Sequence, residues 1–373
     1  MLCHRTPPFH GVAIMGDFVY ESLPKSAFSL FHINISISST VFRRKVSFFK
    51  RFGLISKIFY NYFLKLHQWR PEIIYITPTI TGKGFYRDFI YVQFTKLYVK
   101  IFSRKCRIIL HIHMRPVGTT CIRQYVLFPL FFRDVKVILL SELLLVDFKR
   151  ILNRAHSISY LPNMINPVMS KERISRSLIK YEKWKNERED GLICIAYTGH
   201  LMESKGFKRA LLIGERLIKS NLRIVIKFYG EFGSDNDKEF FMRFIEDADL
   251  NDKVLYCGNY THDKVWTAFV NTHVVILPTY TEAYPLTILE ALSVGVPVVA
   301  THTGAIPEIL DNVSGEVIQH FGSELEFIDG FVRAVNSLLN YWDIDKSKNL
   351  IQRFDDKWCK NRFANKITEI LLS

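Results

Sequence analysis

Short apolar runs of strand length recur along the chain, and segments with the period of a helix lie between them. The runs are continuous rather than alternating, which is typical of strands buried on both faces of a sheet. They occupy residues 73–77, 106–113, 135–141, 192–198, 222–229, 253–257, 274–278 and 296–301. In the segments between them, apolar residues recur at helical spacing, as Phe207, Ala210, Leu211 and Gly214 do. This repeated strand-helix order predicts the α/β class with doubly wound parallel sheets.

The length of 373 residues is more than one ordinary α/β core needs and is sufficient for two. Around residues 171–190 the apolar periodicity gives way to a charge-rich polar run, and a new series begins at Gly191, so we expect the domain junction there. We predict Rossmann-like domains at residues 1–165 and 166–350, followed by a C-terminal helix in residues 351–373 that crosses back to the first domain. Two facing domains of this kind leave a cleft at the carboxyl ends of their strands, where such sheets bind ligands.

The sequence favours a cytoplasmic protein. It contains no apolar run of about eighteen residues that could span a bilayer, and its first residues lack the apolar core of a signal peptide. The six cysteines include no closely spaced pair of the metal-binding kind, so we expect reduced thiols.

Charge is distributed unevenly between the two halves. Residues 1–165 hold 24 Lys or Arg against 7 Asp or Glu, a balance of +17, whereas residues 166–373 hold 26 against 29, a balance of −3. Within the basic half, residues 41–70 interleave cations with aromatic rings and contain no acidic residue. This pattern suits a peripheral contact with an anionic membrane surface, here the inner face of the plasma membrane, and it also suits single-stranded nucleic acid. A core helix with a solvated basic rim is the third interpretation; we favour the membrane and expect no nucleic acid.

The most informative stretch is residues 274–310, VVILPTYTEAYPLTILEALSVGVPVVATHTGAIPEIL. It predicts a strand, a loop and a helix that begins at Pro285 and ends before Gly295. The free backbone N–H groups at the start of this helix form a phosphate site. Glu282 and Glu290 place two carboxylates beside that site, and carboxylates accept hydrogen bonds from hydroxyls. Amide donors for a diphosphate, with acceptors for two polyol groups, are what a nucleotide sugar needs.

From about residue 192 to residue 318 the sequence resembles the retaining glycosyltransferases of family 4, whose GT-B fold has two facing Rossmann-like domains. The paired glutamates of that family match Glu282 and Glu290, and its small-residue turn matches Gly295, Val296 and Pro297. The resemblance implies that Glu282 contacts the donor sugar in a catalytic role and that Glu290 binds the ribose hydroxyls. It also implies donor-phosphate contacts from the backbone of the segment that contains Tyr284, Leu286 and Thr287.

A second match is the segment TGHLMESKG, residues 198–206, at the end of a strand and the start of a helix. A lysine at a helix N-terminus opposes the helix dipole, so Lys205 is expected to meet an anion. In the family this lysine and an arginine five positions earlier bind the donor diphosphate, and here His200 takes the place of the arginine. Either an arginine elsewhere substitutes for it, or donor affinity is reduced and depends on pH.

In the first half, residues 6–16 resemble the family's loop after the first strand, where Gly11 lets the backbone approach the donor. The strand at residues 108–113 directs His111 and His113 to one face. The resemblance implies a catalytic position near the reacting sugar for His113 rather than for His111. Only five residues precede the loop, so the first strand is expected to be short.

These observations predict a hexosyltransferase that uses a nucleoside diphosphate sugar, with retention of configuration implied by the resemblance. A lipid-linked oligosaccharide of a bacterial surface polysaccharide is the acceptor that fits the basic aromatic stretch. We expect no metal cofactor, and we interpret residues 235–237, Asp-Asn-Asp, as a solvated loop rather than a metal site. Two alternatives stay open, a nucleotide-sugar epimerase of similar fold and a non-catalytic protein that binds a nucleotide sugar or a glycan.

Overall fold

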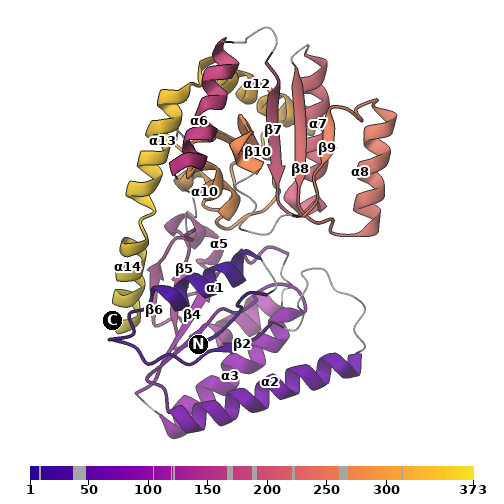
Figure 1. Cartoon of the computed structure of the whole chain (residues 1–373). Helices are drawn as coiled ribbons and strands as arrows, with labels where there is room; N and C mark the ends of the chain where they lie inside the picture. The colour runs from indigo at the N-terminus through magenta and orange to yellow at the C-terminus, as the bar shows by residue number, and fades with distance from the viewer. Residues whose placement is uncertain are drawn as a thin grey trace. The chain divides into compact units, whose positions relative to one another are not determined.

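The computed structural model of the chain divides into two compact units. Unit 1 consists of Met1–Met164 and Lys360–Ser373, and unit 2 of Ile165–Cys359 (Figure 1). The structure describes residues 1–7, 10–36, 48–103, 105–118, 120, 122–165, 171–186, 191–220, 223–259, 268–311 and 314–373.

Unit 1 contains a six-stranded parallel sheet in the order β2-β1-β3-β4-β5-β6. The strands are β1 (Leu2–Cys3), β2 (Ile33–Asn34), β3 (Ile73–Ile76), β4 (Arg107–Ile112), β5 (Lys136–Leu139) and β6 (Ser157–Tyr160). The first strand is as short as expected. Buried residues dominate the inner strands, as continuous apolar runs predict.

Helices cover both faces of this sheet. The helical elements are α1 (Gly11–Ser22), α2 (Phe48–Trp69), α3 (Gly84–Phe102), a π-helix η1 (Arg123–Leu127), α4 (Phe128–Phe131), η2 (Glu142–Leu144), α5 (Leu145–Phe148) and α14 (Lys360–Leu372). The helices α2, α3 and α4 pack on one face, where their aromatic residues form a shared core with the sheet. On the other face α1 packs against α14, with the rings of Phe18 and Phe363 4.9 Å apart.

Unit 2 repeats this architecture with a six-stranded parallel sheet in the order β12-β11-β10-β7-β8-β9. Its strands are β7 (Ile193–Thr198), β8 (Ile224–Tyr229), β9 (Val254–Tyr256), β10 (Val274–Leu277), β11 (Val298–Thr301) and β12 (Gly315–Ile318). The helical elements are α6 (Lys171–Asn186), η3 (Glu203–Lys205), α7 (Phe207–Lys219), α8 (Asp235–Asp247), α10 (Leu286–Leu292), α11 (Ile306–Ile309), α12 (Glu324–Tyr341) and α13 (Ile344–Lys357). The prediction of an α/β protein with two Rossmann-like doubly wound domains is confirmed.

The structure differs from the sequence prediction near the domain boundaries. The units divide after Met164 and again after Cys359, whereas the sequence placed boundaries after residues 165 and 350. The polar run that was expected to form the junction is the helix α6, which packs against α13 within unit 2. A polar helix of this kind is stable because only a narrow side of it is buried, as at Ser177 and Leu178.

Two further structural findings bear on the sequence prediction. Residues 235–237 are not a loop but the first turn of α8, which begins there because the Ser234 side chain accepts a hydrogen bond from the backbone N–H of Asp237. Acidic residues in a first turn also complement the helix dipole. Among the described residues, none of the helices has the length and apolarity to cross a membrane.

Candidate donor-binding site

The two strand ends that the sequence singled out lie next to each other in unit 2, because β7 pairs with β10. The loop after β7 carries His200 and η3, and the loop after β10 carries Glu282 and leads into α10. Pro285 has extended backbone angles, φ −71° and ψ 124°, so α10 begins at Leu286, one residue later than predicted. The helix ends at Leu292, and Gly295 follows it with the left-handed φ of +71°.

Lys205 and Glu282 form an ion pair between these two loops. The Lys205 side chain is 29% exposed and that of Glu282 is 18% exposed, so both groups are reachable by a ligand. The anion predicted beside Lys205 is the Glu282 carboxylate of the protein itself.

Buried hydrogen bonds hold the loop after β7 in place. The Tyr197 hydroxyl, on a fully buried side chain, lies 3.0 Å from the backbone oxygens of both His200 and Lys205, to which it donates. From the other loop, the hydroxyl of Thr279 donates to the backbone oxygen of Ser204 at 3.1 Å. The backbone around Lys205 is therefore fixed from both strand ends.

Two glycines allow the surrounding backbone to approach closely. Gly206 has a φ of +77°, and a Cβ there would lie 2.0 Å from the backbone oxygen of Pro278. Gly304 has a φ of +58°, and a Cβ there would lie 2.0 Å from the backbone oxygen of Glu282. A side chain at Gly206 would push apart the loops that carry Lys205 and Glu282, and one at Gly304 would push the backbone of Glu282 away from the loop after β11.

His200 belongs to the same cluster. Burial lowers the pKa of His200 below its ordinary value, the charge of Lys205 lowers it further, and Glu282 raises it. The imidazole is therefore neutral at pH 7 and close enough to both residues to sense their charges. The structure thus brings together three of the predicted site residues, His200, Lys205 and Glu282.

The remaining predicted residues of unit 2 lie on or just before α10. Glu290 is 6% exposed, which excludes a solvated position. Leu286 and Thr287 are half-buried in the first turn. Tyr284 is buried, and its hydroxyl accepts a hydrogen bond from the Trp358 indole at 3.1 Å, so its phenol is engaged within the unit. Burial also raises the pKa of Tyr284 above its ordinary range. A donor contact at Tyr284 would thus come from its backbone.

Arg209, which sequence reasoning did not identify, supports the loop after β10. Its guanidinium is 4% exposed, donates two hydrogen bonds to Glu324 at 2.5 and 2.7 Å, and stacks on the Tyr280 ring at 3.6 Å. Because Arg209 is engaged in this way, it does not supply the missing arginine of the donor site. No spacing signal could reveal the pair, since Glu324 lies 115 positions further along the chain.

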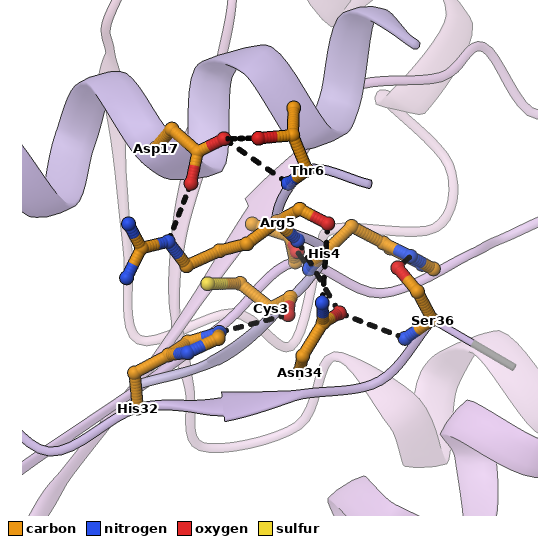
Figure 2. A network of polar contacts seen from close by, with 9 residues as sticks. Cys3, His4, Arg5, Thr6, Asp17, His32, Asn34 and Ser36 are labelled. Carbon is orange, nitrogen blue, oxygen red and sulfur yellow. Dashed lines mark hydrogen bonds and ion pairs between the residues drawn. The ribbon is translucent and has the colours of Figure 1, made fainter. Parts of the chain in front are cut away.

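In unit 1 a polar network orders the loop after β1 (Figure 2). Asp17 of α1 accepts hydrogen bonds from the backbone N–H of Thr6 at 3.0 Å, from its hydroxyl, and from the Arg5 guanidinium at 2.5 Å. The Asn34 side chain, at the end of β2, both accepts from the backbone N–H of Arg5 and donates to its backbone oxygen. The chain segment that leads towards Gly11 is therefore anchored to α1 and to β2.

Gly11 is the first residue of α1, and the ring of His10 caps this helix by accepting from the backbone N–H of Ala13 at 3.3 Å.

His113 directly follows β4, and burial lowers its pKa to about 4, while Asn163 raises it. His111 is fully buried, and its Nδ1 lies 2.6 Å from the Tyr75 hydroxyl. His113 is half-buried, with both ring nitrogens buried. The roles of Gly11 and His113 stay predictions.

Metal ligation finds no support in the parts of the chain that the structure describes. No group of three or more His, Cys, Asp or Glu residues there could hold a metal ion.

Comparison with known proteins shows what most of unit 2 is similar to. Residues 179–353, which lie within unit 2, match the model of the family described as glycosyl transferases group 1. The gpi3 subunit of phosphatidylinositol N-acetylglucosaminyltransferase from Schizosaccharomyces pombe is 24% identical over 208 residues, or 53% of this chain and 44% of that protein. The lipopolysaccharide 1,2-N-acetylglucosaminetransferase of Salmonella typhimurium is 24% identical over 62% of this chain and 63% of that protein. The chain spans about half the length of several curated relatives that it matches.

Solved structures show the same fold. The lipopolysaccharide outer core galactosyltransferase WaaB superposes with a TM-score of 0.64 at 18% identity, covering 99% of each chain. The Anabaena protein HepE in complex with UDP gives a TM-score of 0.62 at 16% identity, covering 86% of this chain and 82% of that one. Residues 179–353 of unit 2 are therefore similar to glycosyl transferases group 1, and the chain has the GT-B fold of two Rossmann-like units.

Proposed function

We propose that the chain is a retaining glycosyltransferase of family 4 that moves a hexosyl group from a nucleoside diphosphate sugar to an acceptor hydroxyl. The observation that carries the proposal is the ion pair of Lys205 and Glu282 at two adjacent strand ends, with His200 beside it. A cation for the diphosphate and a carboxylate for sugar hydroxyls are the two kinds of group that such a donor requires. The binding of UDP and UDP-glucose by HepE, a protein of the same fold, supports this choice of donor class.

In this proposal Lys205 binds the diphosphate and is then shared between that group and Glu282. Glu282 accepts hydrogen bonds from hydroxyls of the donor sugar, and Glu290 accepts them from the ribose. Backbone N–H groups near Tyr284, Leu286 and Thr287 add donors for the phosphate oxygens. These groups meet the charge that develops on the departing diphosphate, so no metal ion is required for that step.

During transfer, the bond from the anomeric carbon to the phosphate oxygen breaks and a bond to the acceptor oxygen forms on the same face. The acceptor proton passes to the departing phosphate oxygen, so a dedicated side-chain base is unnecessary. His113 and Gly11 of unit 1 are proposed to contact the donor sugar and the phosphates. With a pKa of about 4, His113 is neutral at pH 7 and would act by hydrogen bonding rather than by charge.

The acceptor is proposed to be a lipid-linked oligosaccharide used for a bacterial surface polysaccharide, on the cytoplasmic side of the membrane. The names of two relatives support this, because one acts on phosphatidylinositol and the other on lipopolysaccharide. The sequence predicts a membrane contact in residues 41–70, of which 41–47 lie outside the described residues. The helix α2 covers the rest of this segment and exposes the aromatic rings of Tyr60, Phe63 and Trp69.

A panel of nucleoside diphosphate sugars tests the proposal. A thermal-shift screen identifies the donor, because a ligand at a hundred times its Kd stabilises the folded state by about 2.7 kcal/mol. Transfer to an extracted lipid-linked acceptor is then measured for the parent, for Glu282→Gln and for a control, Glu203→Gln. Glu203 lies in the turn η3 but is 65% exposed and pairs with Lys208, so its variant should keep full activity.

We expect Glu282→Gln to retain the fold and to lose at least about a hundredfold of the transfer rate. Incubation with the donor alone separates the alternatives, since an epimerase would convert it to a new sugar nucleotide. His200 in place of an arginine is the observation that favours a non-catalytic binding protein. Donor binding without transfer to any acceptor would establish that alternative in place of the enzyme.

A further inference from the structure

The helix layer of unit 1 formed by α2, α3, η1 and α4 exposes an unusual amount of apolar surface. Of 27 large apolar side chains that are exposed on the described residues, 13 belong to these elements. Monomeric soluble proteins rarely leave contiguous apolar patches of this kind uncovered. A surface on this layer therefore requires a partner.

The clearest stripe runs along α3. Tyr86, Ile90, Leu97 and Ile101 are 49% to 59% exposed and recur at spacings of four, seven and four residues, so they share one face of the helix. The opposite face of α3 is also apolar, with Phe85 and Tyr91 buried in the core. Packing within unit 1 explains why the buried face of α3 is apolar. It does not explain why the exposed face is apolar as well.

The stripe continues onto the neighbouring elements. Lys96 of α3 donates to the backbone oxygens of Leu130 and Phe131 at 2.6 and 3.0 Å, which places α4 beside α3. Tyr125 and Leu130 there are 67% and 42% exposed. On the other side α2 packs against α3, with the rings of Phe63 and Phe94 5.8 Å apart, and Figure 1 shows the two helices side by side.

Charge identifies the class of partner. Residues 48–133 hold fifteen Lys or Arg and two acidic residues. Of the two, Asp88 is buried and bound by Arg87, which leaves Glu72 as the exposed one. Lys83 and Lys100, near the two ends of the stripe, are exposed. Apolar side chains surrounded by cations complement an anionic bilayer, where the former enter the interface and the latter meet the headgroups.

We propose that Tyr86, Ile90, Leu97 and Ile101 of α3, with Tyr125 of η1 and Leu130 of α4, form a bilayer-docking face for anionic lipid. This face lies beyond the segment 41–70 that the sequence singled out. The proposal does not depend on the donor site, because vesicle binding can be present when transfer is absent, and the reverse.

The test is co-sedimentation of the full chain with vesicles of phosphatidylcholine, with and without phosphatidylglycerol. We expect binding to the anionic vesicles that weakens in high salt. Leu97→Gln/Ile101→Gln should lower the partition coefficient about tenfold, because two aliphatic side chains no longer enter the interface. The matched control is Phe321→Gln/Leu325→Gln in unit 2, where both residues are exposed but lie outside the face, and it should change binding less than about twofold.

A third variant, Lys83→Gln/Lys100→Gln, should weaken binding to anionic vesicles only. Circular dichroism verifies that each variant folds, which is expected because all the altered side chains are exposed. Unchanged vesicle binding by Leu97→Gln/Ile101→Gln, or loss of binding in Tyr60→Gln/Leu64→Gln alone, would overturn the proposal. So would a parent chain that self-associates in sedimentation velocity and becomes monomeric in Leu97→Gln/Ile101→Gln, since the face would then be a protein interface.

Discussion

Lys205 and Glu282 are 77 positions apart in the chain and form an ion pair between two adjacent strand ends of unit 2. In the absence of a ligand, each residue satisfies the charge of the other. A bound diphosphate would attract Lys205 and leave the Glu282 carboxylate to accept from sugar hydroxyls. The pair therefore links recognition of the phosphates to recognition of the sugar.

Replacement of the lysine tests this link. Lys205→Met should weaken donor binding by about 2 kcal/mol, or roughly thirtyfold, because a charge-assisted hydrogen bond to the diphosphate is lost. The ligand-free protein should lose only about 1 kcal/mol of its free energy of unfolding, as is usual for a solvent-accessible ion pair. Isothermal titration calorimetry and urea unfolding measure the two quantities. Lys208→Met, which removes a half-buried lysine paired with Glu203, is the control and should leave donor affinity unchanged.

Tyr197→Phe should impair the site without unfolding it. The change removes the hydroxyl that donates to the backbone oxygens of His200 and Lys205, so the turn η3 loses its buried anchor. We expect about 1 kcal/mol less stability and a three- to tenfold weaker donor Kd. Tyr256→Phe is the matched control, because that exposed residue also donates to a backbone oxygen, that of Gly230 at 3.0 Å.

A double variant distinguishes positioning from general stability. If Tyr197 acts by holding Lys205, then adding Tyr197→Phe to Lys205→Met should weaken donor binding little further. Full additivity of the two effects on the donor Kd would contradict a positioning role.

Much of the fold could be predicted from the apolar runs. The runs at residues 192–198 and 274–278 became β7 (Ile193–Thr198) and β10 (Val274–Leu277), because strands buried on both faces need continuous apolar sequence. The edge strands β2, β6 and β12 were missed. An edge strand is covered on fewer sides and needs no such run, so β12 contains the half-buried Glu316.

The site was only partly predictable, for a different reason. The resemblance to the glycosyltransferase family predicted Lys205 and Glu282 as separate site residues. Their ion pair depends on the register of β7 and β10, which the sequence does not reveal. The ion pair of Arg209 and Glu324 could not be predicted from the sequence. Tertiary packing alone determines which charged residues meet when they lie far apart in the chain. The hydrogen bonds of the Tyr197 hydroxyl could not be predicted either, because in a continuous apolar run a tyrosine is counted as one more apolar residue.

His200 predicts a dependence of donor binding on pH. Its lowered pKa keeps it neutral at pH 7, whereas a bound diphosphate would favour the imidazolium, so binding should be accompanied by proton uptake. Donor affinity is therefore expected to rise as pH falls from 7.5 to about 5.5. Calorimetry in buffers with different ionisation enthalpies measures the protons taken up, and a proton count of zero would contradict the assignment of His200.

His200→Arg should restore the missing diphosphate contact. A guanidinium is always charged and can bind two phosphate oxygens at once, so we expect about tenfold tighter donor binding at pH 7.5. The pH dependence between 5.5 and 7.5 should also flatten. His200→Gln is the control, since an uncharged polar residue should remove the pH dependence without the gain in affinity.

Glu324 predicts a contribution to stability that acid removes. The hydrogen bonds from Arg209 are the chief cause that lowers the pKa of Glu324 to about 2, from an ordinary value of 4.5. A carboxyl whose pKa is depressed in the folded state stabilises the protein above pH 4.5, and this stabilisation is lost as pH falls from 4.5 towards 2. Because Glu324 is 43% exposed, solvent screening limits the effect to about 1 kcal/mol.

The Glu324→Gln variant isolates the contribution of the Glu324 charge to the free energy of unfolding. At pH 6 the variant should unfold at a lower urea concentration than the parent, and Tyr280 should lose part of the support that Arg209 gives it. At pH 3 the difference should be smaller, because the carboxyl is then largely protonated in the unfolded state, and it should vanish only as the pH approaches 2. Glu326→Gln is unsuitable as a control because Glu326 caps α12, so Glu239→Gln, an exposed pair partner of Arg243, takes that place. A difference between parent and Glu324→Gln that is the same at both pH values would mean that packing, not charge, is what Glu324 contributes.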